Sequence, residues 1–476
     1  MPETWTIAGL LFVAFEGAGI LSSIHVLMTG RTPQGALAWI FFLILIPYIA
    51  VPLYWVFGPR HYDGYIDARL THPSPFDEII DELRAEGSEF IVDREGGRSA
   101  LIALERIVRL PFTRGNHVEL LVDGDATFGA FFEAITSAKS YIAVQFFIVR
   151  DDRIGRDLLT RLVARAEEGV DVRFLFDEIG SRALSDRFLA DLRAAGVQIR
   201  PFSTTRRANR FQLNFRNHRK LLIVDGEVAF VGGLNCGDEY MGRDPEMSPW
   251  RDTFTRIQGP SVQALQLSFV EDWHWSTDDI PSWNWRPRAA KSGVDWNALV
   301  LPTGPADTFE SCSLVFVSLF HAAETRLWLS TPYFVFDNQV LSALQLAALR
   351  GVDVRILVPE KADYETAYLA GWSFHAEVLE SGAQIYRYND GFLHQKALLI
   401  DDDLAMLGTM NLDNRSMRLN FEVGVLVENG TFAADVAAML EADFALSTEV
   451  RPGHIEDRTF WFRLKARIAR LFAPIL

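Results

Sequence analysis

The sequence predicts an α/β protein made of two tandem copies of one α/β unit, preceded by an N-terminal hairpin of two transmembrane helices. Three observations carry this prediction. The first 60 residues hold two long apolar stretches, the later chain alternates apolar strands with amphipathic helices, and the same order of segments occurs twice. The expected division is 1–60 for the hairpin, 61–115 for a charged connector, 116–280 and 296–450 for the two copies, and 451–476 for a C-terminal tail.

The hairpin is predicted from length and apolarity. Residues 5–28 and 36–57 are almost entirely apolar, and a short polar turn separates them. Each stretch exceeds the roughly 20 residues that cross a bilayer as a helix. The second stretch contains Pro47 and Pro52, which remove backbone donors and favour a kinked or partly re-entrant helix.

The charges that flank the hairpin indicate how it is oriented. Two crossings place the N-terminus and the body on one side of the membrane. Arg60, His61 and Arg69 follow the second stretch, whereas the turn carries only Arg31. The positive-inside rule therefore favours a multi-pass protein of the cell membrane with two spans and a cytoplasmic body.

The body is predicted to be duplicated because equivalent segments recur in one order. Two buried strands correspond, each is followed by a helix, and two further short segments then match. These pairs are 141–148 with 327–334, 169–173 with 351–355, and 196–199 with 382–385. The copies meet near residues 275–300. Internal similarity of this kind indicates two copies of one fold.

A motif of chemically active residues occurs once in each copy, with the pattern H-x-K-x-x-x-x-D. Its members are His218, Lys220 and Asp225 in the first copy, and His394, Lys396 and Asp401 in the second. An apolar run follows each lysine and predicts a buried strand, and residues i and i+2 of a strand point to one face. Each histidine should therefore share a face with its lysine, while each aspartate stands at the start of a tight turn and looks structural.

Further residues are matched downstream of the two motifs. Each motif aspartate is followed by a glycine after seven residues and by an asparagine after ten (235 − 225 and 411 − 401). These residues are Gly232 and Asn235 in the first copy, and Gly408 and Asn411 in the second. The intervening strands should return to the motif end of the sheet. Each copy can therefore present a histidine, a lysine and an asparagine at one sheet end.

This pair of motifs resembles the phospholipase D superfamily, and the wider sequence is similar to bacterial cardiolipin synthases over nearly the whole chain. The similar segments are Y-W-V-F-G at 54–58, F-R-N-H-R-K at 215–220, G-G-L-N at 232–235, P-W-R-D-T at 249–253, T-P-Y-F at 331–334, G-T-M-N-L-D at 408–413, R-S at 415–416 and L-N-F-E at 419–422. Met417 and Gly424 depart from the expected pattern, outside the chemistry. The resemblance implies two phospholipase D-like domains with pseudo-twofold symmetry, whose motifs meet in one active site.

The resemblance also implies a two-step reaction that uses no metal or other cofactor. One neutral histidine attacks the lipid phosphorus and forms a phosphatidyl-histidine. The other histidine donates a proton to the departing glycerol and then acts as base for the incoming alcohol. Histidine suits both tasks because its pKa lies near neutrality. We assign His218 as the nucleophile and His394 as the acid and base, and the reverse assignment fits the same motifs.

Other residues are expected to support this chemistry. Positive charge and neutral donors stabilise a phosphoryl-transfer transition state. The residues expected to supply them are Lys220, Lys396, Asn235 and Asn411. Asp252 and Glu422 resemble family carboxylates that orient the histidines through the second ring nitrogen, as in a catalytic triad. The alternative for these two residues is that they are ordinary surface acids.

The leading functional prediction is the condensation of two phosphatidylglycerol molecules into cardiolipin and glycerol. A phospholipase D or transphosphatidylase with another donor or acceptor is the alternative, because the motifs act on the shared phosphodiester. A nuclease is disfavoured by the net charge of −16, and an inactive scaffold by the two intact motifs. The expected partners are phosphatidylglycerol, other anionic phospholipids and the membrane, with no nucleic acid.

Two basic segments are candidates for lipid contact. The first precedes and enters the first motif, and it could attract anionic headgroups or form a solvated loop. It comprises Arg206, Arg207, Arg210, Arg216, Arg219 and Lys220. The second is the tail, which places apolar residues at helical spacing between basic ones. It predicts an amphipathic helix that either lies on a membrane or packs on the body.

Overall fold

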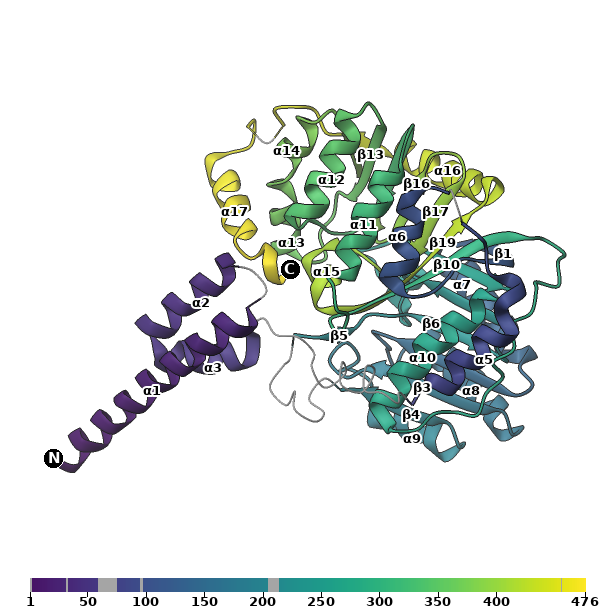
Figure 1. Ribbon diagram of the computed structural model, residues 1–476, viewed down its shortest axis with the longest axis horizontal. Coiled ribbons are helices and arrows are strands. Elements are labelled where there is room, and N and C mark those ends of the chain that lie inside the picture. The colour runs from purple at the N-terminus through teal and green to yellow at the C-terminus, as the bar shows by residue number, and fades with distance from the viewer. Residues whose placement is uncertain (1, 31–32, 59–74, 95–96, 204–213, 455) are drawn as a thin grey trace. The chain divides into compact units, whose positions relative to one another are not determined.

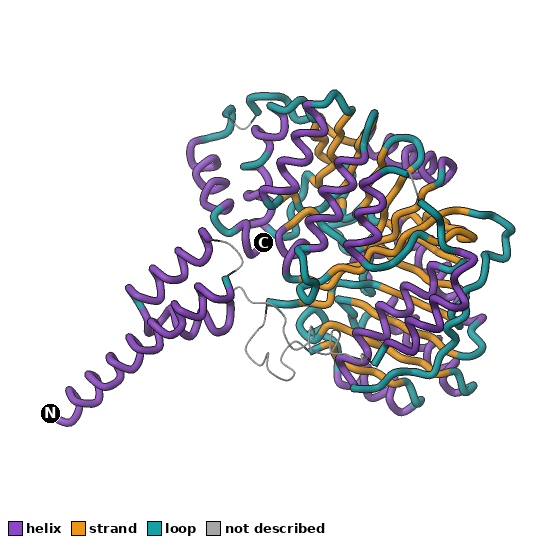
Figure 2. The backbone as a smooth tube through the Cα atoms, in the orientation of Figure 1, coloured by secondary structure: helices purple, strands orange, loops and turns teal. Residues whose placement is uncertain are grey.

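The computed structural model describes residues 2–30, 33–58, 75–94, 97–203, 214–454 and 456–476. These residues belong to two units, of which one comprises 1–74 with 203–215 and the other, the body, comprises 75–202 with 216–476. Figures 1 and 2 show the first unit as helical and the body as strands enclosed by helices.

The N-terminal unit contains the helices α1 (Pro2–Thr29), α2 (Pro33–Leu45) and α3 (Pro47–Phe57), which pack on one another. Among the described residues, one helical segment, Gly9–Thr29, is long and apolar enough to cross a membrane. The second apolar stretch, expected as a kinked or partly re-entrant helix, is divided at Ile46 into α2 and α3. The physical reason is Pro47, because a residue before proline is disfavoured in helical conformation.

The body contains one mixed sheet of 16 strands. Outward from its centre, the first half of the sheet runs β1 (Thr113–Val122), β9 (Thr253–Gln258), β7 (Val228–Gly232), β6 (Leu221–Val224), β2 (Tyr141–Phe146), β3 (Asp171–Asp177) and β4 (Gln198–Phe202). The second half runs β10 (Trp296–Thr303), β19 (Asn420–Glu428), β17 (Leu404–Gly408), β16 (Ala397–Ile400), β11 (Arg326–Ser330), β13 (Asp353–Pro359), β14 (Gln384–Tyr388) and β20 (Ser447–Glu449). Antiparallel pairing of β1 with β10 joins the halves. The sixteenth strand, β5 (Arg216–Asn217), lies outside this series and pairs with β19.

Helices connect the parallel strands and cover both faces of the sheet, as parallel pairing requires. The main helices of the body are α7 (Asp123–Ser137), α8 (Arg153–Glu167), α9 (Asp186–Ala194), α10 (Ser261–Thr277), α11 (Ser311–Ala322), α12 (Asn338–Leu349), α13 (Glu365–Trp372), α14 (His375–Leu379), α16 (Gly430–Ala445) and α17 (Phe460–Arg470). Part of the segment expected as a connector is also helical, forming α5 (Asp77–Gly87) and α6 (Ser99–Val108). α6 buries Leu101 and Leu104 in the core of the second half.

The sheet brings both motif histidines to equivalent positions. β6 runs antiparallel to β2, with Leu221 opposite Gln145, and β16 runs antiparallel to β11, with Ala397 opposite Ser330. The residues just before β6 and β16 therefore lie at the carboxyl edge of the parallel strands. Ligands of open α/β sheets bind at this edge.

Candidate active site

Each motif segment pairs with the opposite half of the body. The short strand β5 (Arg216–Asn217) lies parallel to β19, and the amide of His218 donates to the carbonyl oxygen of Phe421 at 2.9 Å. In the same way β15 (Phe392–Leu393) lies parallel to β8 (Trp250–Arg251), and the amide of His394 donates to the carbonyl oxygen of Arg251 at 2.8 Å. The two motifs thus meet in one composite site.

Each motif histidine is hydrogen-bonded to a carboxylate from the other half. Nδ1 of His218 lies 3.0 and 2.9 Å from the two carboxylate oxygens of Glu422. Nδ1 of His394 lies 2.7 Å from Oδ2 of Asp252. All four residues are buried. Because the carboxylates hold Nδ1, Nε2 is the nitrogen of each ring that can meet a phosphorus atom.

The two motif lysines are buried beside the histidines. Nζ of Lys220 donates to the carbonyl oxygen of His218 at 2.6 Å. Nζ of Lys396 donates to the carbonyl oxygen of His394 and lies 2.7 and 3.1 Å from its ring nitrogens. A lysine ammonium has three donors and no acceptor. Both lysines can therefore turn donors from these local contacts to the oxygens of a phosphoryl group.

Burial dominates the electrostatics of the site. It lowers the pKa of His218 to about 4 and that of His394 to about 3, against the opposing pull of Glu422 and Asp252. Burial also lowers the pKa of Lys220 to about 7 and that of Lys396 to about 8. Without a phosphate, both imidazoles are therefore neutral near pH 7. An arriving phosphodiester anion favours the protonated form of whichever histidine acts as acid.

Two glycines let the strands that carry the orienting carboxylates come close. A Cβ atom at Gly232 would collide with the carbonyl oxygen of Thr253 at the start of β9, directly after Asp252. A Cβ atom at Gly408 would collide with the carbonyl oxygen of Val423 on β19, next to Glu422. The matched glycines of the sequence therefore have a packing role in the site.

The two asparagines occupy different environments. Asn235 accepts from the amide of Ile148 at 3.0 Å and donates to the hydroxyl of Tyr240 at 3.1 Å. Oδ1 of Asn411 is buried and has no hydrogen-bond partner among the described residues. A carboxamide nitrogen carries two hydrogens, so Asn235 retains one donor beyond its bond to Tyr240. Asn411 brings an unpaired acceptor into the same site.

The motif aspartates lie away from the chemistry. Four-residue strands, β6 and β16, separate them from the lysines, a length of roughly 13 Å at about 3.3 Å per residue. Asp225 accepts from the backbone amides of Lys139, Ser140 and Tyr141, and Asp401 from those of Glu324, Thr325 and Arg326. These bonds agree with the structural role expected of both motif aspartates, at the amino ends of β2 and β11.

Two buried aspartates that the sequence reasoning missed hold the motif segments in place. Asp272 on α10 accepts from Gln145, Asn217 and Arg219 at 2.8, 2.7 and 2.9 Å. Asp443 on α16 accepts from Arg251 and Gln395 at 2.9 and 2.8 Å.

Asp272 lies 20 residues past Asp252, and Asp443 lies 21 past Glu422 (272 − 252 and 443 − 422). This repeated spacing was the signal that could have identified them.

The basic segment before the first motif is only partly described. Arg206, Arg207 and Arg210 lie outside the described residues. Arg219 is 2% exposed and donates to Asp272 and to the carbonyl oxygens of Ser268 and Glu422. The prediction that Arg219 could attract lipid headgroups is therefore wrong, because its guanidinium is used inside the protein, where it links the two halves.

Neither cysteine belongs to the site, and no metal-binding group was found in the parts of the chain that the structure describes. Cys236 and Cys312 are buried free thiols whose pKa is raised by burial. Across the described ranges, no three His, Cys, Asp or Glu side chains are arranged to hold a metal ion. The described polar groups of the site are imidazoles, carboxylates, ammonium groups and carboxamides.

Family models match most of the body and the N-terminal helices. One, described as the phospholipase D-like domain of cardiolipin synthase, matches residues 131–273 and 316–444, more than half of the chain. Another, described as the phospholipase D-nuclease N-terminal segment, matches residues 18–59. Both copies of the duplicated unit are thus covered by the same family description.

Similar proteins extend over the full length. Cardiolipin synthase A of Pseudomonas aeruginosa is 47% identical over 478 residues, which covers 99% of this chain and 96% of that protein. Cardiolipin synthase A of Pseudomonas fluorescens SBW25 is 44% identical over 462 residues, with 96% of each chain covered. Among solved structures, phosphatidylserine synthase of Haemophilus influenzae aligns with a TM-score of 0.59 and 15% identity, covering 79% of this chain and 100% of that one. This last likeness concerns the fold alone, and it agrees with two tandem α/β units.

Proposed function

The chain belongs to the cardiolipin synthases of the phospholipase D superfamily, and on this basis we propose that its composite site joins two phosphatidylglycerol molecules into cardiolipin and glycerol. The enzyme is a phosphatidyltransferase. The observation that carries the proposed site is the crossed pairing of His218 with Glu422 and of His394 with Asp252. In the proposed arrangement, the domains 116–280 and 296–450 are related by pseudo-twofold symmetry, and each completes the site of the other.

The first step transfers a phosphatidyl group to the enzyme. Nε2 of His218 attacks the phosphorus of one phosphatidylglycerol, a P–N bond forms, and the P–O bond to the headgroup glycerol breaks. His394 donates its proton to the departing glycerol oxygen. Glu422 stabilises the positive charge that develops on the ring of His218, and both motif lysines hold the phosphoryl oxygens.

The second step transfers the group to another lipid. A headgroup hydroxyl of a second phosphatidylglycerol attacks the phosphorus, the P–N bond breaks, and a new P–O bond forms. The proton of that hydroxyl passes to His394, which regains its starting state. Asp252 orients His394 through Nδ1 in both steps. The two glycerol oxygens, leaving and entering, therefore both lie on the His394 side of the phosphorus.

The proposed membrane arrangement has two spans and a cytoplasmic body. Gly9–Thr29 supports the first span by its length and composition. The pair α2 and α3 would form the second, with the break before Pro47 inside the membrane. Tags on the N-terminus and on the body should both be shielded from an impermeant reagent in intact cells. A body tag that reacts from outside refutes the cytoplasmic orientation.

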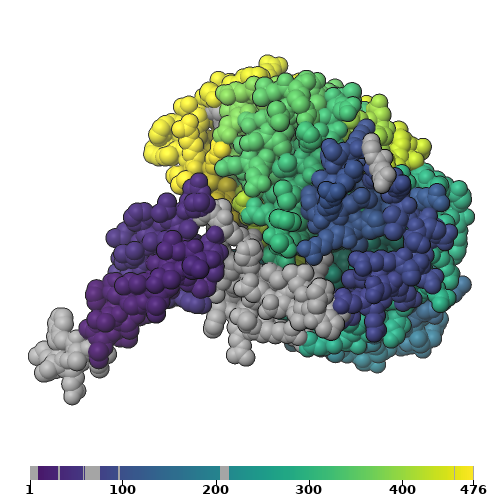
Figure 3. Space-filling view, in the orientation of Figure 1, coloured from purple at the N-terminus to yellow at the C-terminus, as the bar shows by residue number. Residues whose placement is uncertain are grey.

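The C-terminal helix α17 is proposed to lie on the membrane. Ala466 and Ala469 are buried on the body side of the helix, and Figure 3 shows the C-terminal segment, in yellow, at the surface. Several of its apolar side chains are exposed, including Trp461 at 70%, and Leu471, directly after the helix, is 77% exposed. Arg463, Lys465 and Arg467 supply basic charge, whereas Arg470 pairs with Glu377 on the body, and no acidic residue lies within the helix. The helix thus packs on the body and also presents an apolar, basic surface.

Purified protein in vesicles of phosphatidylglycerol tests the proposed function directly. Lipid mass analysis should find cardiolipin together with one released glycerol per product. Phosphatidic acid as the main product would instead indicate hydrolysis. His218→Ala and His394→Ala should each abolish both products while the thermal unfolding midpoint stays close to that of the wild type. Substantial turnover by either folded variant would refute the composite site.

A further inference from the structure

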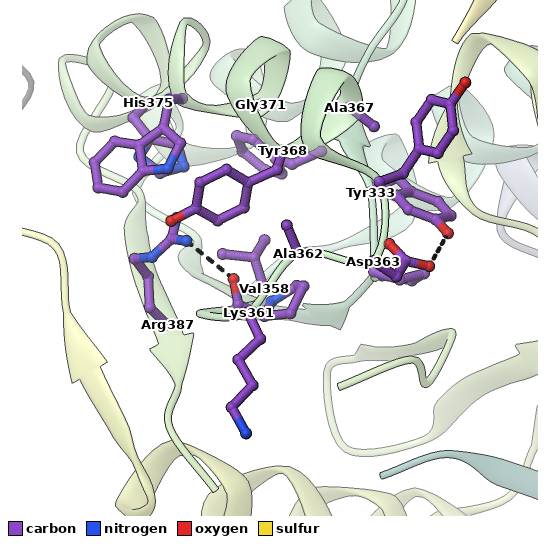
Figure 4. Close-up of a pocket in the computed structure, with 15 residues that line it drawn as sticks. Tyr333, Val358, Lys361, Ala362, Asp363, Ala367, Tyr368, Gly371, His375 and Arg387 are labelled. Atoms are coloured by element: carbon purple, nitrogen blue, oxygen red, sulfur yellow. Dashed lines mark hydrogen bonds between the residues drawn. The ribbon is translucent and has the colours of Figure 1, made fainter. Parts of the chain in front are cut away.

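A pocket lies beside the active site in the second half of the body. It is formed at the carboxyl ends of β11, β13 and β14, its cavity volume is about 20 Å³, and its mouth is open to solvent. Figure 4 shows Tyr368 and Arg387 on one side of this pocket and Tyr333 with Asp363 on the other. The enclosed part has room for about one water-sized group. A lipid headgroup would therefore enter it only in part and would bind at the open mouth.

Tyr333 connects the pocket to the active site. Its ring is edge-on to the imidazole of His394, with the ring centroids 6.5 Å apart. Its hydroxyl donates to Oδ2 of Asp363 at 2.6 Å. Asp363 also attracts Lys396 electrostatically. The inner wall of the pocket is thus adjacent to the histidine that handles both glycerol oxygens.

The opposite wall offers groups suited to a phosphate. Arg387 is 5% exposed, pairs with Glu360, and lies 4.3 Å from the ring centroid of Trp372. Nε1 of Trp372 and Nδ1 of His375 have no hydrogen-bond partner among the described residues, although these side chains are only 1% and 2% exposed and line the pocket. Unpaired buried polar atoms are costly, so a polar ligand would satisfy them.

A second cation stands at the rim of the pocket. Lys361 is exposed, and its Nζ makes one hydrogen bond, of 3.3 Å, to the carbonyl oxygen of Glu246. An exposed lysine with one long hydrogen bond can turn toward an anion at little cost. Lys361 therefore provides positive charge at the mouth of the pocket, and the guanidinium of Arg387, paired with Glu360, lies at its back.

The outer side of the pocket adjoins α17. Trp372 contacts Phe462 of this helix, with the ring centroids 5.6 Å apart, and the guanidinium of Arg458 lies 4.8 Å from the Trp372 ring. The exposed apolar side chains of α17 follow on the same helix. The pocket thus connects the proposed membrane-facing helix with His394.

The chemistry of the two steps indicates which lipid would use such a pocket. The glycerol that leaves in the first step carries no phosphate once it has left. The hydroxyl that enters in the second step belongs to a glycerol that still carries its own phosphodiester and acyl chains. The cations of the pocket lie on the His394 side, next to an apolar surface. They can bind the phosphodiester of this acceptor lipid, but they add nothing to the binding of free glycerol or water.

We propose that this pocket binds the headgroup of the acceptor lipid. Arg387, Lys361 and the indole N–H of Trp372 bind its phosphodiester. Asp363, beside Tyr333, accepts a hydrogen bond from its glycerol and guides the attacking hydroxyl toward His394. The assignment rests on the proposed function, with His394 as acid and base. Under this assignment, the pocket is the feature by which the enzyme selects a lipid acceptor over free glycerol.

Competition between two acceptors tests this proposal. Full-length protein in phosphatidylglycerol vesicles receives ¹³C-glycerol, which attacks the same phosphatidyl-histidine and yields ¹³C-labelled phosphatidylglycerol. The ratio of cardiolipin to labelled phosphatidylglycerol reports acceptor choice within one reaction. Lys361→Gln should lower this ratio about tenfold, the effect of one charge-assisted contact. Trp372→Phe, which keeps a ring but removes the N–H, should lower it by about threefold or more.

Lys291→Gln is the matched control, because Lys291 is also an exposed lysine, paired with Glu227 at 2.6 Å on the segment between the halves. Its ratio should equal that of the wild type. An unchanged ratio in Lys361→Gln and Trp372→Phe overturns the proposal. An equal loss of cardiolipin and labelled phosphatidylglycerol in variants with a normal unfolding midpoint also overturns the proposal, because it would assign the pocket to the donor lipid.

Two further arms complete the test. ¹³C-glycerol phosphate should be a much poorer acceptor than the lipid, because it lacks the chains that α17 would receive. Its use as readily as the lipid would overturn the assignment of a membrane-borne acceptor. A wild-type protein that forms labelled phosphatidylglycerol but no cardiolipin would refute the proposed function itself, independently of any pocket variant.

Discussion

Nδ1 of His394 lies 2.7 Å from a carboxylate oxygen of Asp252, although 142 residues separate the two in the chain. His218 and Glu422, which are 204 residues apart, are paired in the same way, but here the histidine belongs to the first half and the carboxylate to the second. Neither half of the body therefore contains a histidine together with its orienting carboxylate. In the proposed mechanism, catalysis therefore depends on how the two halves dock, and not only on the fold of each.

Asp252→Asn and Glu422→Gln should each reduce the rate of cardiolipin formation by roughly 10²- to 10⁴-fold, as for the orienting carboxylate of a catalytic triad. The amides keep the shape of the side chain but remove the charge that stabilises the protonated or phosphorylated ring. Cardiolipin formation by purified variants at equal vesicle concentration measures the effect. Asp402→Asn, whose side chain is 92% exposed, is the control and should stay within twofold of the wild type. A rate above about a tenth of normal in Asp252→Asn contradicts the proposed role.

The activity of the free enzyme should fall as the pH rises through 7 to 8. Burial lowers the pKa of Lys220 to about 7 and that of Lys396 to about 8, so both lose their proton and charge in this range. Neutral amines no longer attract the phosphodiester, and kcat/KM for phosphatidylglycerol therefore declines on the alkaline side. A bound phosphate raises both pKa values, so kcat should decline at a higher pH than kcat/KM. Rates measured across pH 5–10 in vesicles of constant composition give both kcat and kcat/KM. A kcat/KM that stays flat to about pH 9 would contradict the role of the two lysines in binding the phosphodiester.

Asp401→Ala should lower the stability of the body without removing catalysis. The carboxylate of Asp401 accepts from three successive backbone amides at the start of β11, and its own backbone has a φ of 51°. Losing these bonds and placing alanine at positive φ should cost roughly 2–4 kcal/mol of unfolding free energy. Asp401→Asn should cost less, because asparagine tolerates this conformation. Thermal unfolding midpoints test the order, and activity per folded molecule should remain close to normal. Abolished activity in a folded Asp401→Asn variant would return Asp401 to the catalytic set.

A fluorescent label on α17 should enter a nonpolar environment in the membrane. Cys236 and Cys312 are buried, so a cysteine in Trp461→Cys can be labelled selectively with an environment-sensitive dye. Emission should shift to the blue in vesicles containing phosphatidylglycerol, and the shift should weaken at high salt. Leu349→Cys on α12 is the control, since Leu349 is 70% exposed on a helix without this basic surface. Equal emission from both labels would contradict membrane contact by α17.

The sequence alone was enough to predict the parts of this protein that depend on local pattern. The duplicated strands, the two motifs with their downstream glycines and asparagines, and the amphipathic C-terminal helix all follow from spacing and periodicity. The break before Pro47 also has a local cause, yet the sequence left open whether this helix would be kinked or partly re-entrant. Local rules identify a residue that disfavours helix, but the chain on both sides decides whether the helix bends or ends.

Only the tertiary structure decided how these parts are combined. The sequence indicates that His218, His394, Asp252 and Glu422 belong together, whereas docking of the halves determines that each histidine meets the carboxylate of the other half. Arg219 reads as a surface cation in the sequence and is a buried link between the halves in the structure. The pocket beside Tyr333 combines the carboxyl ends of β11, β13 and β14 with residues of the helices α13 and α14. Periodicity and spacing report on neighbours along the chain, and contacts between distant segments are set by packing of the whole body.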